Sequence, residues 1–140
     1  MNKSSGRKND WLLPPCHSVA GVGANTRTTV RSGDDVTPGC VMGIGAAPDR
    51  SFQWTATEAG DYTIDTAGSN FDTVLIVRDS CSAGAAQLAC NDDRSATNLQ
   101  SEVNITATAG QTFIITVDGY TAEAGDFVVN IQATAPATDD

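Results

Sequence analysis

The feature that most limits the fold is the run from Thr73 to Val77, in which every side chain is β-branched or aliphatic. Such a run is typical of a β-strand that is buried on both faces. Charged and small residues follow it, from Arg78 to Ser80. We therefore expect a central strand at this position that leads into a surface loop.

Other segments show the two-residue alternation of a strand with one buried face and one solvated face. Residues 51–57, 61–65 and 102–108 alternate in this way. Two further strands are expected at 112–118 and 126–132, the second with Phe127, Val129 and Ile131 on one face. We expect the apolar side chains of these strands to furnish most of the core. The expected core residues are Phe52, Trp54, Tyr62, Ile64, Val74, Ile76, Val103, Ile105, Phe113 or Ile115, Val117, Phe127 and Val129.

An Ala-Gly pair stands just before three of the expected strands, at Ala59-Gly60, Ala109-Gly110 and Ala124-Gly125. Glycine adopts positive φ readily, so these pairs predict turns that lead into strands. No window of the sequence has the pattern of a useful amphipathic helix. Short strands separated by such turns predict an all-β fold, an antiparallel β-sandwich of jelly-roll type.

A chain of 140 residues with 40% hydrophobic residues is the right size for one domain with a real core. We predict a β-sandwich domain over residues 34–134. A flexible lead-in over residues 1–33 precedes it and can contribute one edge strand, near Thr26 to Arg31. Residues 135–140 are expected to form a disordered tail.

The chain is acidic, with a formal net charge of -9 at pH 7. Residues 1–50 contain six basic and four acidic side chains, whereas residues 51–140 contain two basic and thirteen acidic ones. Nucleic-acid recognition needs a surplus of Lys and Arg, so the charge argues against a nucleic-acid partner. No run of apolar residues is long enough for a membrane span.

Residues 1–10 are polar and charged, and Trp11-Leu12-Leu13 is too short for the apolar region of a signal peptide. We expect the chain to be a fragment, a mature form with added residues, or a product with an unusual start.

The four cysteines are Cys16, Cys40, Cys81 and Cys90, and the single histidine is His17. Their spacing matches no CxxC pattern, so disulfides are favoured over a zinc site and imply an oxidising compartment. We predict a Cys81–Cys90 disulfide that closes a short loop. A Cys16–Cys40 bond follows only by elimination, and these two could equally be unpaired.

A cluster of oxygen-bearing side chains surrounds the central strand and the loop after it, namely Asp72, Asp79, Asn91, Asp92 and Asp93. Ca²⁺ binds six to eight hard oxygen ligands of this kind. The alternative is that Asp72 and Asp93 accept backbone hydrogen bonds that shape the loops, while Asp79 and Asp92 are simply solvated. The sequence leaves a calcium site and a loop-shaping role open.

Catalytic machinery is not apparent. His17 stands in the lead-in, and the sequence has no HExxH and no GxSxG motif. Hydrolysis needs a nucleophile with a base, or a metal with an activated water. We expect the chain not to be an enzyme.

The aromatic residues are few. Trp54 and Tyr62 fall on inward strand positions and are expected in the core rather than on a sugar-stacking surface. Tyr120 is the candidate for contact with a ligand, although a corner tyrosine packed on the sandwich would have the same sequence pattern.

Several motifs in order resemble the bacterial pre-peptidase C-terminal domain family, over roughly Asp49 to Gln132. They are Ser51-Phe52-Gln53-Trp54, Ala59-Gly60-Asp61-Tyr62-Thr63-Ile64, Phe71-Asp72-Thr73-Val74-Leu75, Leu88-Ala89-Cys90-Asn91-Asp92-Asp93, Ala109-Gly110-Gln111-Thr112, Val117-Asp118-Gly119-Tyr120 and Gly125-Asp126-Phe127. The resemblance implies a secreted β-sandwich module of the kind appended to extracellular peptidases and other hydrolases.

The function that the resemblance implies is non-catalytic binding or positioning of an extracellular polymer, protein or polysaccharide, for an associated hydrolase. The alternative is a structural or adhesive extracellular subunit that assembles with copies of itself through sheet edges or calcium-bridged loops.

Overall fold

The computed structural model describes residues 19–30, 40, 48–80, 86–93, 100–120 and 123–134. These residues form eight strands: β1 (Gly23–Thr28), β2 (Arg50–Thr55), β3 (Gly60–Asp65), β4 (Thr73–Arg78), β5 (Gln87–Asn91), β6 (Glu102–Ala107), β7 (Thr112–Gly119) and β8 (Asp126–Ala133). The described part of the chain contains no helix, and therefore none that could cross a membrane.

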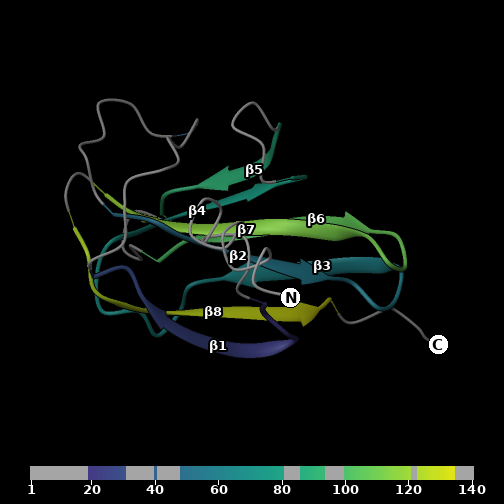
Figure 1. Ribbon diagram of the computed structural model, residues 1–140, viewed down its shortest axis with the longest axis horizontal. Helices are drawn as coiled ribbons and strands as arrows, with labels where there is room; N and C mark the ends of the chain where they lie inside the picture. Colours follow the sequence, from purple (N-terminus) through teal and green to yellow (C-terminus); the bar gives the residue numbers. More distant parts are fainter. Residues whose placement is uncertain are drawn as a thin grey trace, which may run out of the picture.

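The strands form two four-stranded sheets, with the orders β1-β8-β3-β6 and β2-β7-β4-β5. Every pair of neighbouring strands is antiparallel. The strands of the first sheet follow one another from β6 to β1 across Figure 1, and the second sheet lies against them. This strand order is that of a jelly roll, so the predicted fold class is confirmed.

The central position of β4 explains its continuous apolar sequence. It pairs with β7 on one side and with β5 on the other, and all six of its residues are buried. Alternate residues face opposite sides of a strand, and Leu75 and Val77 face the cluster between the two sheets. Val74 and Ile76 are fully buried, as predicted, but they lie on the other face of β4 and outside this cluster. A run without alternation gives no indication of which set faces inward.

Three aromatic side chains pack against one another in the core. The Trp54 ring lies edge-on to Tyr62, with centroids 4.8 Å apart, and is stacked on Phe113 at 5.6 Å. The Tyr62 hydroxyl donates a hydrogen bond to the Glu58 carbonyl, 2.8 Å away. Trp54 is only 2% exposed, which confirms that it belongs to the core and not to a sugar-stacking surface.

The sandwich begins earlier in the chain than expected. β1 covers Gly23–Thr28, whereas the edge strand was expected near Thr26 to Arg31, and β1 pairs with β8 along its whole length. The predicted tail over residues 135–140 lies outside the described residues.

A network of buried hydroxyl groups joins the two sheets at one end of the sandwich. Thr66 follows β3, Thr73 begins β4 and Ser101 precedes β6, and all three are fully buried. Thr66 Oγ1 and Thr73 Oγ1 are 2.7 Å apart, and the Ser101 N–H donates to Thr66 Oγ1 over 2.8 Å. The network therefore fixes the start of β4 relative to β3 and β6.

Candidate functional site

Three carboxylates gather at the end of the sandwich that contains the hydroxyl network, because β4 and β5 run antiparallel. Asn91, at the end of β5, is level with Leu75 near the start of β4. The residues after Asn91 therefore return toward Asp72, which comes just before β4. One carboxylate oxygen from each of Asp72, Asp92 and Asp93 lies within 4.8 Å of the others. We call these three residues the acidic corner.

The oxygens of the acidic corner are poorly satisfied. The Oδ1 atoms of Asp72, Asp92 and Asp93 are buried and have no hydrogen-bond partner in the part of the chain described here. No backbone N–H among the same residues donates to these carboxylates. Buried oxygens without donors are costly, and neighbouring carboxylates repel one another. The arrangement therefore favours a shared proton or a bound cation.

Burial and repulsion both make ionisation of the corner unfavourable. Burial, followed by the charges of Asp92, Asp93 and Glu123, raises the pKa of Asp72 from 3.8 to about 6. A hydrogen bond to the Asp93 side chain contributes in the same direction. The pKa of Asp92 is also raised, first by burial and then by the charge of Asp93. A cation bound among these oxygens would reverse both effects.

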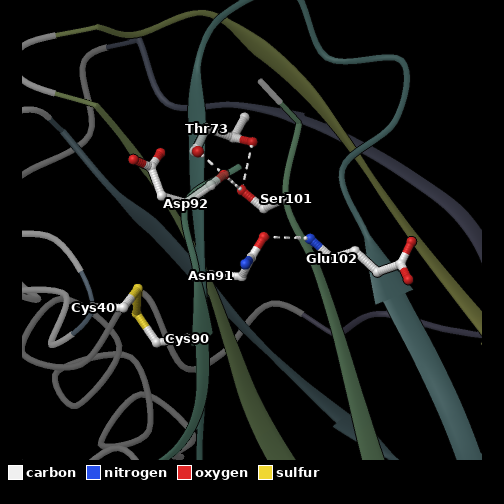
Figure 2. Close-up of a disulfide and its surroundings, with 7 residues drawn as sticks. All are labelled: Cys40, Thr73, Cys90, Asn91, Asp92, Ser101 and Glu102. Carbon is white, nitrogen blue, oxygen red and sulfur yellow. Dashed lines mark hydrogen bonds between the residues drawn. A yellow bond between two sulfur atoms is a disulfide. The ribbon is translucent and has the colours of Figure 1, made fainter. Parts of the chain in front are cut away.

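The Ser101 side chain donates a hydrogen bond to the backbone of Asp92. Ser101 Oγ lies 2.6 Å from the Asp92 carbonyl oxygen and 2.9 Å from that of Thr73. Figure 2 shows the Asp92 carbonyl facing Ser101, while the Asp92 carboxylate points away from it. The hydroxyl network thus anchors the main chain and leaves the carboxylate available for another partner.

Two of the predicted metal ligands do not join the corner. The Asn91 side-chain oxygen accepts the Glu102 N–H over 3.0 Å, so it ties β5 to β6 (Figure 2). Asp79 is exposed and follows the opposite end of β4 from Asp72. A strand rises about 3.3 Å per residue, so Asp72 and Asp79 are roughly 20 Å apart.

Tyr120 and Glu123 lie beside the acidic corner. The Tyr120 N–H donates to the Asp72 carbonyl oxygen over 2.9 Å, and the Asp72 N–H donates to Glu123 Oε1 over 3.0 Å. Tyr120 is 38% exposed, so part of its side chain is open to a ligand. The loop after β7 therefore places the main chain of Tyr120 and a fourth carboxylate, that of Glu123, next to Asp72.

The acidic corner fits a calcium ion in donor type and spacing. Oxygen ligands lie 2.3–2.6 Å from Ca²⁺, so ligands on opposite sides of one ion are about 4.8 Å apart. The separation of the three carboxylate oxygens does not exceed this value. Asp72, Asp92 and Asp93 could hold the ion, with the remaining ligands supplied by neighbouring oxygens or water.

The disulfide of Cys90 differs from the prediction. Cys90 is bonded to Cys40, with a Cα–Cα distance of 5.7 Å, so the predicted Cys81–Cys90 and Cys16–Cys40 pairs are both wrong. Cys90 lies within β5, level with Ile76 of β4. Cys16 and Cys81 lie outside the described residues.

Sequence reasoning missed the hydroxyl network and Glu123. Serine and threonine are common throughout this chain, and nothing in their spacing distinguishes Thr66, Thr73 and Ser101 from solvated residues. Glu123 is 51 residues from Asp72 and reaches it only through the fold. No sequence signal could have identified either feature.

No family model matches the sequence, and no curated protein matches it. Among solved structures, the pre-peptidase C-terminal domain of a collagenase from Bacillus anthracis aligns with a TM-score of 0.53 and 13% identity, covering 82% of this chain and 93% of that one. A periplasmic inhibitor of g-type lysozyme from Salmonella Typhimurium aligns with a TM-score of 0.40, 12% identity, and coverage of 84% and 99%. A family 35 carbohydrate-binding module from an environmental isolate aligns with a TM-score of 0.35 and 20% identity, covering 81% of this chain and 93% of that one. The first of these alignments shows a shared fold, and we infer nothing from the other two.

Proposed function

We propose that this chain is a non-catalytic extracellular module that binds or positions a polymer, protein or polysaccharide, for an associated hydrolase. We further propose that Ca²⁺ bound at the acidic corner organises the contact surface around Tyr120. The observation that carries this proposal is the convergence of three carboxylates, each with a buried oxygen that has no hydrogen-bond partner among the described residues, next to the main chain of the partly exposed Tyr120.

A cation at the corner would act on the contact surface through the main chain. Asp72 contacts the loop after β7 twice, through its carbonyl oxygen to Tyr120 and through its N–H to Glu123. A cation that neutralises the negative charge around Asp72 would hold both of these hydrogen bonds in place. The exposed ring of Tyr120 supplies apolar area and a polar hydroxyl, a combination common at binding surfaces.

The extracellular location is supported by the Cys40–Cys90 disulfide, because such bonds persist in oxidising compartments. The collagenase domain that shares this fold supports the accessory role, since that domain is part of a peptidase.

The experiment is retention of the purified chain by insoluble polymers, namely collagen, cellulose, chitin and peptidoglycan, in Ca²⁺ and in EDTA. We expect one polymer class to retain the chain in Ca²⁺ only. Tyr120→Ala and the double variant Asp92→Asn/Asp93→Asn should lose retention. Val22→Ala removes a more exposed apolar side chain elsewhere, 67% exposed, and should behave as wild type.

Failure of every polymer to retain the folded chain would contradict the binding role. A mass that rises with concentration, measured by light scattering, would instead support the alternative of a self-assembling subunit. The proposed contact surface would be contradicted if wild type were retained equally in Ca²⁺ and in EDTA and if Tyr120→Ala were retained as well as wild type.

A further inference from the structure

In the part of the chain that the structure describes, the two sheets have four edge strands, and three of them carry features that hinder pairing with another strand. Natural proteins protect sheet edges because unpaired backbone groups can recruit a further chain. On β1, Arg27 turns inward, with its guanidinium 5.9 Å from the centroid of the buried Phe52 ring. An inward-pointing charge at an edge opposes the addition of a strand.

The two edges of the other sheet are hindered differently. Residues before β1 cover part of the β2 edge, because Val19 forms a bridge with Gln53 and the Ala20 N–H donates to the Gln53 carbonyl over 2.9 Å. β5 is five residues long, and its register with β4 shifts between Val77 and Arg78. Short and irregular edges are poor templates for pairing.

β6 is less protected, because the contact at its outer edge among the described residues is made at its first residue, where Asn91 accepts the Glu102 N–H. It pairs with β3 in unbroken register from Glu102 to Ala107, and it contains no Pro, Gly, Lys or Arg. Its outward side chains Asn104 and Thr106 are exposed. On its other side, no strand pairs with it among the residues that the structure describes.

The open backbone groups of β6 can be identified from its hydrogen bonds. The Glu102 N–H points away from β3, because it donates to the Asn91 side chain over 3.0 Å. The main-chain groups of a strand alternate in direction with a period of two. The N–H and C=O groups of Asn104 and Thr106 therefore point to the same open edge as those of Glu102.

The surface next to this edge is acidic. Asp61, Asp65 and Glu102 lie on the solvent-facing side of β3 and β6, and all three are exposed or half-buried. The described arginines are on β1, β2 and β4, so none is on β3, β6 or β8. A shallow hollow of about 290 Å³, lined by Asp61, Asn104, Ile105, Thr106 and Thr134, borders the edge.

We propose that the open edge of β6 accepts an extended, basic peptide segment of a partner protein as an added strand. Main-chain hydrogen bonds to Asn104 and Thr106 would supply the affinity, and alternate side chains would supply the specificity. Side chains opposite Asn104 and Thr106 fall on the acidic face, where Lys or Arg can reach Asp61 and Glu102. A second copy of this chain fits poorly, because β6 itself carries no basic residue to meet that face. This proposal does not depend on the calcium site.

The test uses the full chain in EDTA and a short fluorescent peptide in which Lys alternates with Val and Thr. A peptide with Glu in place of Lys is the charge control. Asn104→Pro and Asn104→Ala both remove the side chain and its bond with Thr63, but only proline also removes the outward N–H. We expect Asn104→Pro to weaken binding about tenfold or more, and Asn104→Ala to weaken it less than about threefold.

Charge variants and hydrogen exchange complete the test. Asp61→Asn with Glu102→Gln should weaken binding, whereas Asp126→Asn, on the same face but on β8, should have a smaller effect. Should Asn104→Pro fail to fold, amide exchange on the wild-type chain decides, since saturating peptide should protect the Asn104 and Thr106 amides.

Equal affinity of the Asn104→Pro and Asn104→Ala variants, or equal binding of the Lys and Glu peptides, would overturn the proposal. Protection at the acidic corner instead of at β6 would also overturn it. A dimer that Asn104→Pro abolishes would show that the edge pairs with a second copy and not with a basic partner. Because EDTA is present throughout, failure here leaves the calcium-dependent polymer binding separately testable.

Discussion

The backbone N–H of Tyr120 donates to the carbonyl oxygen of Asp72 over 2.9 Å. This bond joins the start of β4 to the loop after β7. It links Tyr120, which is partly exposed, to a residue whose carboxyl pKa is raised to about 6. A change in charge at Asp72 therefore occurs one hydrogen bond away from the candidate contact residue. The first two predictions follow from this arrangement.

Calcium should raise the melting temperature of the chain. A ligand that binds only the folded state stabilises it by about 2.7 kcal/mol at one hundred times its dissociation constant. Asp92→Asn/Asp93→Asn should abolish this gain. Asp79→Asn removes a carboxylate at the other end of β4 and should retain it. Thermal melts in EDTA and in millimolar Ca²⁺ measure the effect, and an unchanged wild-type melt would exclude the ion.

Without Ca²⁺, stability should fall as the pH rises through the range between the two pKa values of Asp72. Its pKa is raised from 3.8 to about 6 in the folded state, so the folded chain binds more protons than the unfolded chain in this range. Asp72→Asn should flatten this part of the profile. It should also stabilise the chain at pH 7 by about 1 kcal/mol, a value reduced for solvent screening of a partly exposed group.

The measurement is the difference in unfolding free energy between wild type and Asp72→Asn across this pH range, in EDTA. Subtraction cancels the titrating groups that do not interact with Asp72, and Asp79→Asn is the control. A difference that does not change with pH would show that Asp72 ionises normally in the folded chain.

The sequence predicted the fold better than it predicted the candidate site. Strand alternation is a local signal, and it located β2, β3, β6 and β8 well because each buries mainly one face, whereas β7 was located although it is buried on both faces. The site depends on register. Whether Asp79 or Asp93 lies near Asp72 is decided by the antiparallel pairing of β4 with β5, which no composition or spacing reveals.

The same limit applies to the cysteines and to the hydroxyl network. Short spacing favoured Cys81 as the partner of Cys90, but the fold brings Cys40 to Cys90 across 50 residues of sequence. Ser101 looks like an ordinary polar residue in the sequence, yet it is fully buried and contacts main-chain oxygens of two strands. The disulfide and the hydroxyl network both depend on contacts between segments that are distant in the sequence. No local pattern in a single sequence reveals such contacts.

Truncation of Trp54 should strongly destabilise the sandwich. Its ring is 2% exposed and packs against Tyr62 and Phe113, so Trp54→Ala leaves a cavity between the sheets. The expected cost is about 3–5 kcal/mol, with a smaller loss for Trp54→Phe, which fills part of the space. Chemical denaturation measures both values. A loss below about 1 kcal/mol for Trp54→Ala would be inconsistent with a packed core at this position.

The Cys40–Cys90 disulfide should contribute substantially to stability because it links segments far apart in the sequence. For a separation of 50 residues, the chain-entropy model gives about 4 kcal/mol, and measured values for native disulfides are typically about 2–5 kcal/mol. Cys40→Ser with Cys90→Ser should therefore lower the unfolding free energy by about 2–4 kcal/mol while keeping the two-sheet fold. Replacing both cysteines avoids a free thiol that could form a new bond.

Peptide mapping without reduction tests the connectivity directly. Protein made under oxidising conditions should yield a fragment in which the Cys40 peptide is linked to the Cys90 peptide. Denaturation of wild type and of the double variant then measures the energy. A fragment that links Cys81 to Cys90, or a double variant as stable as wild type, would contradict the disulfide described here.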